Sequence, residues 1–222
     1  ICVPGKDEVY FIDTCGNPAN IYDATMIENQ DYWANVKSKS ESCGAGSGNI
    51  LSDDCGNCNY LQGSFCRDED SAGESPAYGD YICADLNCYS TSNGQSYKHG
   101  ESWCVNNDAG STGDGENSVG SRFYKHICIN GEEVLEQCGD LRSQICIEDD
   151  IEGFSQAACR ANRWQHCTTR DNRQDCENTD KMDCRWLKGV KFGKSTNGAC
   201  LPTDSPGFNF WDDGETQEIC AQ

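Results

Sequence analysis

The sequence predicts a small disulfide-rich fold, mostly β-strand and loop, with one or two short helices. The 222 residues include 18 cysteines, an even number that allows nine bridges. The net charge is −20, and large aliphatic residues are too few for a conventional core. Such a composition without cross-links is typical of disordered chains. Bridges reverse that expectation, because each typically contributes about 2–4 kcal/mol by restricting the unfolded chain.

We expect every cysteine to lie in a structural disulfide and none to bind zinc. The stretches CGNC at 55–58 and CADLNC at 83–88 superficially resemble a zinc ribbon. However, Asp53, Asp54 and Asp85 would add negative charge to a dianionic site, and they would raise the thiol pKa values that a redox role needs to be low. The cysteines expected to be bridged are Cys2, Cys15, Cys43, Cys55, Cys58, Cys66, Cys83, Cys88, Cys104, Cys128, Cys138, Cys146, Cys159, Cys167, Cys176, Cys184, Cys200 and Cys220.

This cysteine content indicates an oxidising compartment, so we expect an extracellular or cell-surface location. The sequence starts at Ile1 without a signal segment, and it has no apolar run long enough to cross a bilayer. We therefore expect a mature or excised portion that is not inserted in a membrane. The 37 acidic residues against 17 basic ones argue against nucleic acid or an anionic membrane as a partner.

Two stretches resemble each other, ICVPGKDEVYFIDTCGN at 1–17 and ICINGEEVLEQCGD at 127–140. Both have the pattern of a hairpin. In the second, residues 122–138 form two strand patterns around Asn130-Gly131, a dipeptide typical of a type I′ turn. The turn predicts three cross-strand pairs on one face, Ile127 with Val134, Lys125 with Glu136, and Phe123 with Cys138. Cys128 falls on the opposite face, so Cys128 and Cys138 should bond elsewhere.

A helix is expected near 155–168, with Ser155 as its N-cap and with Ala157, Ala161 and Trp164 along one stripe. In such a helix Cys159 and Cys167 would lie about 12 Å apart along the axis. That distance exceeds the roughly 7 Å limit between bridged Cα atoms. The nearest candidate partners are Cys176, Cys184, Cys200 and Cys220.

Exposed loops at 68–80 and 106–121 predict three parts. These are an N-terminal cysteine-rich part, a middle part with the hairpin, and a C-terminal part with the helix, at 1–67, 68–149 and 150–222. They are interpreted either as separate domains or as one stapled body.

No motif indicates catalysis or a cofactor, and we expect the chain not to be an enzyme. The acidic loops 68–74 and 106–117 are the candidate calcium ligands, but neither has EF-hand spacing, and solvated loops are the simpler interpretation. His99, His126 and His166 are scattered along the chain and suggest neither a triad nor a metal site. The five Trp and nine Tyr could stack on sugars, although core packing is their simplest role.

The stretches Gly100–Val105, Val119–Cys146 and Ala158–Trp186 resemble cysteine-rich ectodomain segments of predicted secreted or surface proteins from small-genomed uncultivated archaea. The resemblance implies a surface location. It implies no activity, since none is assigned to that group, and it transfers no functional residue to this chain.

We therefore expect an extracellular structural or adhesive module, in its most specific form a repeating subunit of a surface filament or layer. Its expected partners are copies of itself or a larger surface assembly, because open strand edges invite pairing. A secreted carbohydrate-binding module is the alternative, and a secreted hydrolase is the third. A row of exposed aromatics beside Asn or Asp would favour the sugar binder, and a cleft with two carboxylates would favour the hydrolase.

Overall fold

The computed structural model describes residues 1–21, 26, 28–29, 57–73, 75–76, 79–106, 122–189 and 197–206. Within these ranges, strands and loops dominate, and the two α-helices are single turns, α1 (Glu69–Ala72) and α2 (Arg173–Cys176). The expected fold class is confirmed.

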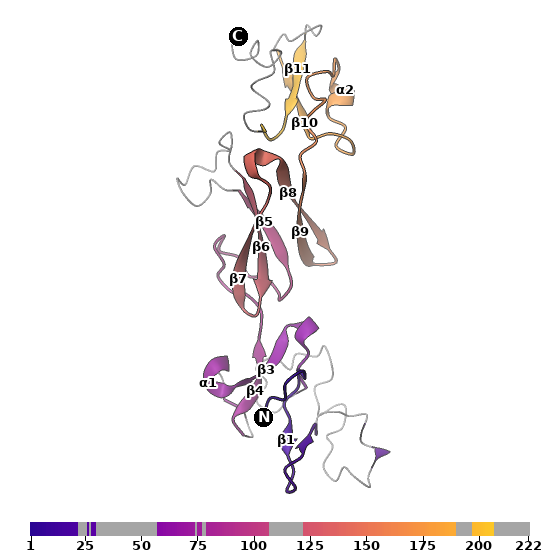
Figure 1. Cartoon of the computed structure of the whole chain (residues 1–222). Coiled ribbons are helices and arrows are strands. Elements are labelled where there is room, and N and C mark those ends of the chain that lie inside the picture. Colours follow the sequence, from indigo (N-terminus) through magenta and orange to yellow (C-terminus); the bar gives the residue numbers. More distant parts are fainter. Residues whose placement is uncertain are drawn as a thin grey trace. The chain divides into compact units, whose positions relative to one another are not determined.

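The strands form small separate sheets rather than one extended sheet (Figure 1). The sheets of the described residues are β1-β2, β3-β4, β5-β6-β7, β8-β9 and β10-β11. The strand bounds are β1 (Phe11–Ile12), β2 (Pro18–Ala19), β3 (Ser64–Asp68), β4 (Tyr81–Asp85), β5 (Ser102–Asn106), β6 (Phe123–Ile129), β7 (Glu132–Gln137), β8 (Gln144–Ile151), β9 (Phe154–Ala161), β10 (Cys184–Lys188) and β11 (Gly198–Pro202).

The chain forms two compact units. The first comprises Ile1–Glu101 and Cys128–Val134, and the second comprises Ser102–Ile127 and Leu135–Gln222. The division differs from the three parts expected from loop composition. The expected boundaries at 67/68 and 149/150 fall inside β3 and β8, where cross-strand pairing continues through them.

The predicted hairpin is present as β6 and β7. Asn130 and Gly131 form its turn with φ values of +57° and +81°, as a type I′ turn requires. The ion pair between Lys125 and Glu136, 2.6 Å apart, lies at the expected register. Sheet pairing also adds β5 beside β6, which the sequence did not indicate.

The helix expected near 155–168 is wrong, because β9 occupies its first half. This strand pairs antiparallel with β8, and Ile151 lies opposite Phe154. Glu152 and Gly153 make the turn between the strands with φ values of +56° and +78°. The alanine spacing suggested a helix, but pairing with β8 and hydrogen bonds from Ser155 and Ala157 to the distant Ser102 override such a local preference.

Among the residues that the structure describes, seven disulfides join cysteines that are distant in sequence. Cys128 and Cys138 bond elsewhere, as expected, and Cys167 bonds one of its four expected candidates. Cys159 bonds none of them. The bridges are Cys2–Cys66, Cys58–Cys83, Cys88–Cys128, Cys104–Cys146, Cys138–Cys159, Cys167–Cys184 and Cys176–Cys200.

Cys15 differs from the expectation of a full set of bridges, because it is an exposed free thiol. Cys43, Cys55 and Cys220 lie outside the described residues. The bridging of these three stays a prediction, whereas a total of nine would also require Cys15 to be bridged.

Each unit contains the same four-cysteine element, which we call a block. The first block is 58–88 and the second is 138–167. In both, seven residues separate the first two cysteines, a short 3-10 turn lies between them, and the second cysteine is opposite the third in a hairpin. The first cysteine bonds the third, the second bonds an earlier strand or segment, and the fourth bonds a later strand.

The blocks also match in a backbone hydrogen bond. In the first block the amide of Leu86 donates to the carbonyl of Gly63 at 2.9 Å. In the second the amide of Asn162 donates to the carbonyl of Ser143, also at 2.9 Å. Donor and acceptor stand at the same offsets from the block cysteines in both cases. The chain thus repeats one structural element. The sequence similarity between 1–17 and 127–140 aligned Cys2 with Cys128, but the bridges make Cys104 the counterpart of Cys2, because each bonds the second cysteine of its block.

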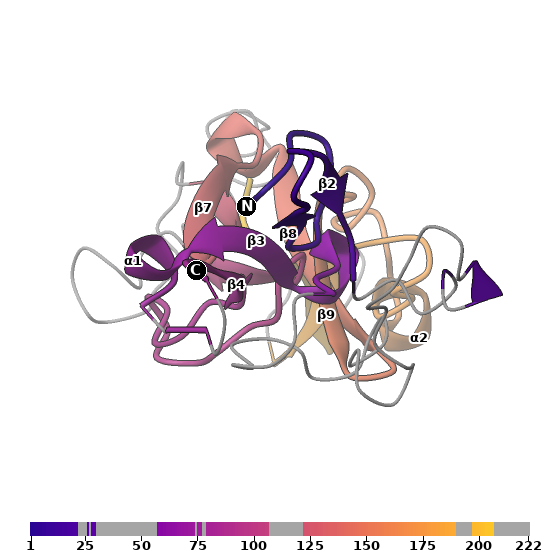
Figure 2. The same cartoon turned by 90° about the horizontal axis from the view of Figure 1, so that it is seen from below.

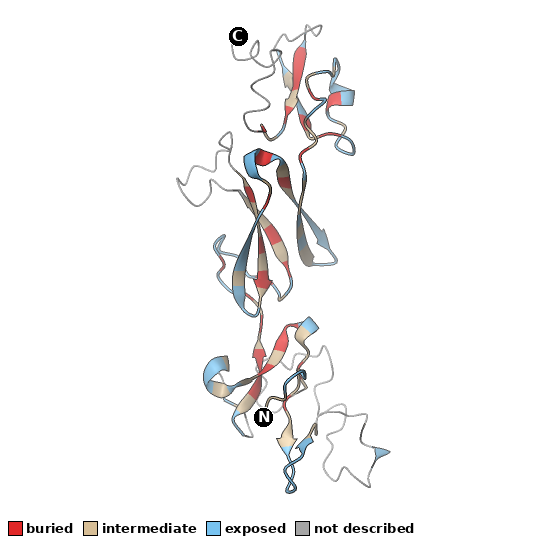
Figure 3. Cartoon of the chain, in the orientation of Figure 1, coloured by how far each residue is buried: buried red, intermediate tan, exposed pale blue. Residues whose placement is uncertain are grey.

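The cores are small and are built around cystines, as Figure 3 shows by the short buried stretches of each hairpin. In the first unit Val9 packs with three bridged cysteines, and Phe11 and Tyr81 lie against them. In the second unit Phe123 and Ile145 pack with Cys138. Helix α1 directly follows β3 (Figure 2) and has no buried residue.

We predict that non-reducing peptide mapping will recover the seven pairs above. The decisive pairs are Cys58–Cys83 and Cys138–Cys159, because they define the blocks. Iodoacetamide should label Cys15 in the folded protein, since it is exposed and unbridged. A peptide joining Cys58 or Cys138 to another cysteine would contradict the structure.

Replacing Gly131 with Val should destabilise the protein by at least about 1 kcal/mol, because a β-branched residue resists positive φ. The Gly131→Asn variant is the matched control, since Asn tolerates this conformation and should cost less. Chemical unfolding with intact bridges would measure both. Equal stability of the two variants would count against the turn.

Candidate functional site

The β8–β9 hairpin has two faces with different surroundings. Side chains alternate along a strand, and the observed register brings Ile147 opposite Ala158 and Ile151 opposite Phe154 on one face. Ile147 and Ile151 are 41 % and 52 % exposed, and Phe154 is half-buried. We call these four side chains the outer face, and the same alternation places the exposed Asp149 opposite Gln156 between the two pairs. Figure 3 shows this part of the hairpin as largely exposed.

The opposite face is packed on β5. The Ser155 hydroxyl donates to the carbonyl of Ser102 at 3.0 Å, and the amide of Ala157 donates to the hydroxyl of Ser102 at 2.8 Å. The Cys104–Cys146 bridge fixes the same contact covalently. The outer face is therefore a sheet face with apolar pairs on both sides of Asp149 and Gln156, and it is presented by a hairpin that is anchored from behind.

Acidic side chains surround the turn of this hairpin. Glu148 accepts a hydrogen bond from the amide of Cys104, and Asp150 accepts one from the amide of Gly153 at 2.8 Å. Asp149 and Glu152 are exposed beside them. By alternation Asp149 lies on the outer face, whereas Glu148 and Asp150 lie on the reverse face, so the outer face combines exposed apolar side chains with the charge of Asp149.

A buried carboxylate organises the C-terminal part of the second unit. Asp183 accepts two hydrogen bonds of 2.6 Å from the Arg160 guanidinium and one of 2.8 Å from the amide of Arg163. Burial acts to raise the pKa of Asp183, but the hydrogen bonds and the charge of Arg160 outweigh it and lower the pKa to about 2. Its backbone carbonyl also accepts from Thr203. Asp183 therefore ties four segments together and is a structural residue.

The buried guanidinium of Arg142 extends this charged region. Its side chain lies 5.9 Å from the ring centre of Phe123 and donates to the carbonyl of Ser205. Burial raises the pKa of the nearby Asp204 carboxyl, while the charge of Arg142 opposes the rise. Arg142 therefore has a structural role, because the groups around it are parts of the fold.

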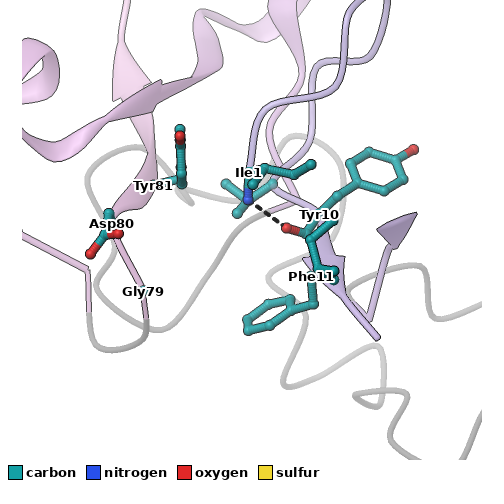
Figure 4. A pocket seen from close by; sticks show the side chains of 8 residues that line it. Ile1, Tyr10, Phe11, Gly79, Asp80 and Tyr81 are labelled. Carbon is teal, nitrogen blue, oxygen red and sulfur yellow. Dashed lines mark hydrogen bonds between the residues drawn. The ribbon is translucent and has the colours of Figure 1, made fainter. Parts of the chain in front are cut away.

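The first unit holds a pocket of about 200 Å³. It lies between the N-terminal segment and the start of β4, and Figure 4 shows Phe11, Asp80 and Tyr81 around it. The backbone nitrogen of Ile1 donates to the carbonyl of Tyr10 at 2.7 Å and closes one wall. The remaining lining residues are Val9, Ile12 and Gly79.

The acidic loops do not form the expected candidate calcium site where the structure describes them. Asp68 instead caps α1 by accepting a hydrogen bond of 3.0 Å from the amide of Ser71. Asp70 is exposed in the helix. No group of three or more potential metal ligands occurs among the described residues, and 107–117 lie outside them.

The three histidines are scattered along the sequence, and each has different surroundings. His99 accepts from the amide of Asn130, and its burial lowers its pKa. His126 is buried in β6, with its ring 5.6 Å from that of Trp103. His166 is exposed. Cys58, Cys83 and Cys88, which had the spacing of a zinc ribbon, carry bridged sulfurs.

Neither the outer face nor the pocket was identified from the sequence. The alternation of Ile145, Ile147 and Ile151 before Glu152-Gly153 was a usable hairpin signal. The pocket gave no such signal, because its walls are about 70 residues apart along the chain.

No family model, curated protein or solved structure matches this chain. Within the described ranges, none of the helices combines the length and apolarity needed to cross a bilayer. The disulfide content is that of a secreted or extracellular protein.

We predict that Asp183→Asn will destabilise the second unit by an amount on the order of 2 kcal/mol near neutral pH. Because the pKa of Asp183 is lowered, its contribution is fully present above the usual carboxyl pKa and is lost as the pH falls toward about 2. Unfolding measured between pH 5 and pH 2 should show this loss in the native chain and less of it in the variant. Asp171→Asn, at an exposed site, is the control and should retain the native profile.

Proposed function

We propose that the chain is an extracellular structural module that associates with copies of itself through the outer face of the β8–β9 hairpin. The observation that carries the proposal is the exposure of Ile147 and Ile151 on a face whose reverse side is bonded to β5. The hairpin already packs on β5 through its reverse face, so the outer face is the side that is open to a further layer. A second copy can supply that layer.

The outer face differs from the other exposed apolar side chains. Leu61 and Tyr89 are 88 % and 65 % exposed, but they occur singly, and scattered apolar residues are normal on protein surfaces. On the outer face, by contrast, Ile151 and Phe154 are direct cross-strand neighbours. Burying such side chains contributes about 1.5–3 kcal/mol each.

A two-fold contact through this face gives a dimer. A filament or layer needs a second contact, because only non-closing interfaces build open polymers. Strand β7 is a candidate, since it is the edge of its sheet and carries the exposed Val134 and Leu135. Pairing along an edge strand satisfies its free backbone groups.

The acidic residues at the hairpin turn give this association a salt dependence. Two copies that meet through the outer face bring the Asp149 carboxylates of both copies together. Their repulsion is screened by salt and neutralised by bound cations. Association should therefore weaken at low ionic strength or with a chelator.

The test compares Ile147→Lys/Ile151→Lys with the native chain in sedimentation velocity at several concentrations and salt levels. The native chain should self-associate more tightly at high salt, and the double variant should bind itself about tenfold or more weakly. Leu61→Lys is the control, because it adds charge at an isolated exposed site. Electron microscopy of the native chain would detect polymers.

Two outcomes would reject the proposal. One is a native chain that stays monomeric at all concentrations and salt levels. The other is a double variant that associates as the native chain does. Peptide mapping of the bridges would verify that the variant is folded, because the block bridges form only when the hairpins are correctly paired.

A further inference from the structure

The pocket of the first unit has walls that are fixed in place. One wall is the segment from Ile1 to Ile12, and the other is the start of β4. The Cys2–Cys66 bridge and the Cys66–Cys83 register connect the two walls through β3. A pocket with such walls loses little conformational entropy when a ligand binds.

The aromatic side chains of the pocket pack against the cystine core of the first unit and still keep part of their surface exposed. Trp103, Phe123 and Tyr97 are 1 %, 7 % and 8 % exposed and fill the cores. Phe11 and Tyr81 are only half-buried, and both line the pocket (Figure 4). Their rings offer apolar surface to a molecule that enters it.

Asp80 supplies the polar group of the pocket. Its side chain is exposed, and its backbone is held by a hydrogen bond of 2.9 Å from the amide of Glu69 to its carbonyl. A carboxylate accepts hydrogen bonds and donates none. The nitrogen of Ile1, which donates to the carbonyl of Tyr10, is the donor group at the opposite wall.

The size of the pocket restricts the ligand further. At about 200 Å³ it is smaller than the 300–1,000 Å³ typical of sites for drug-sized molecules. It can take one ring rather than an extended chain. A hexopyranose has an apolar CH face that packs on an aromatic ring, and it has hydroxyl groups that donate to a carboxylate.

We propose that this pocket binds a single neutral hexopyranose unit, stacked on Phe11 or Tyr81 and hydrogen-bonded through its hydroxyls to Asp80. This site is independent of the self-association proposed above, and it lies in the other unit. A module with both features would attach to a glycan through one unit and to its copies through the other.

The experiment is saturation-transfer NMR on the intact, bridged chain with the methyl glycosides of glucose, galactose, mannose and N-acetylglucosamine as probes. At least one glycoside should receive saturation, most strongly at the protons of its CH face. Asp80→Asn should weaken that binding about tenfold or more, because hydrogen bonds to a charged group contribute about 1.5–3 kcal/mol. Phe11→Ala and Tyr81→Ala should each also lower the affinity for the glycoside relative to the native chain.

The first unit provides a matched control pair outside the pocket. The Tyr89 hydroxyl donates to Asp85, and Tyr89 is 65 % exposed. Tyr89→Ala and Asp85→Asn should leave glycoside binding unchanged.

The proposal is overturned if none of the four glycosides receives saturation. It is also overturned if the control pair weakens binding as much as Asp80→Asn does, or if tetramethylammonium binds and the glycosides do not. Because Asp80→Asn lies at an exposed site, loss of folding is not the expected cause of its effect. Peptide mapping of Cys2–Cys66 and Cys58–Cys83 verifies this.

Discussion

The bridge between the first and third cysteines of each block is the linkage on which the rest of the structure depends. Cys58–Cys83 and Cys138–Cys159 close loops of 25 and 21 residues, which corresponds to roughly 3–4 kcal/mol each in the chain-entropy account. The second cysteine lies opposite the third, so its own bridge brings another segment to the same point. Three segments are thereby joined where few aliphatic side chains are available to hold them.

The sequence predicted those features that depend on neighbouring residues. The β6–β7 hairpin followed from Asn130-Gly131 and from strand alternation on either side, because a two-residue turn also determines register. The helix prediction was wrong at Ser155 and Ala157 because the hydroxyl of Ser155 and the amide of Ala157 form hydrogen bonds with Ser102, which is far away in sequence. Bridge partners could not be assigned, since sequence spacing does not determine which distant cysteines meet.

The candidate sites could be predicted less well than the fold, for the same physical reason. The composition indicated that edges and aromatics would be available for association, but not which ones. The pocket exists only because Cys2 reaches β3, and the outer face exists only because β9 is a strand. The pocket therefore depends on a long-range bridge, whereas the outer face depends on a local hairpin in a segment where alanine spacing suggested a helix. The repeated spacing of Cys58 to Cys66 and Cys138 to Cys146 was visible in the sequence and was the signal that would have identified the blocks.

The order of the bridges also determines how the chain responds to tension or to a protease. Between Cys2 and Cys200, the seven described bridges form overlapping rings that leave only 83–88 and 159–167 outside any ring. A backbone cut within a ring leaves the pieces joined. The second gap contains Arg160 and Arg163, the two arginines that bond to Asp183, and Asp183 lies inside the next ring. Ion pairs between these arginines and Asp183 therefore connect the two sides of the gap. A trypsin-like protease cleaves after Arg or Lys, so the arginines at which it would cut this gap are the ones bound to the Asp183 carboxylate.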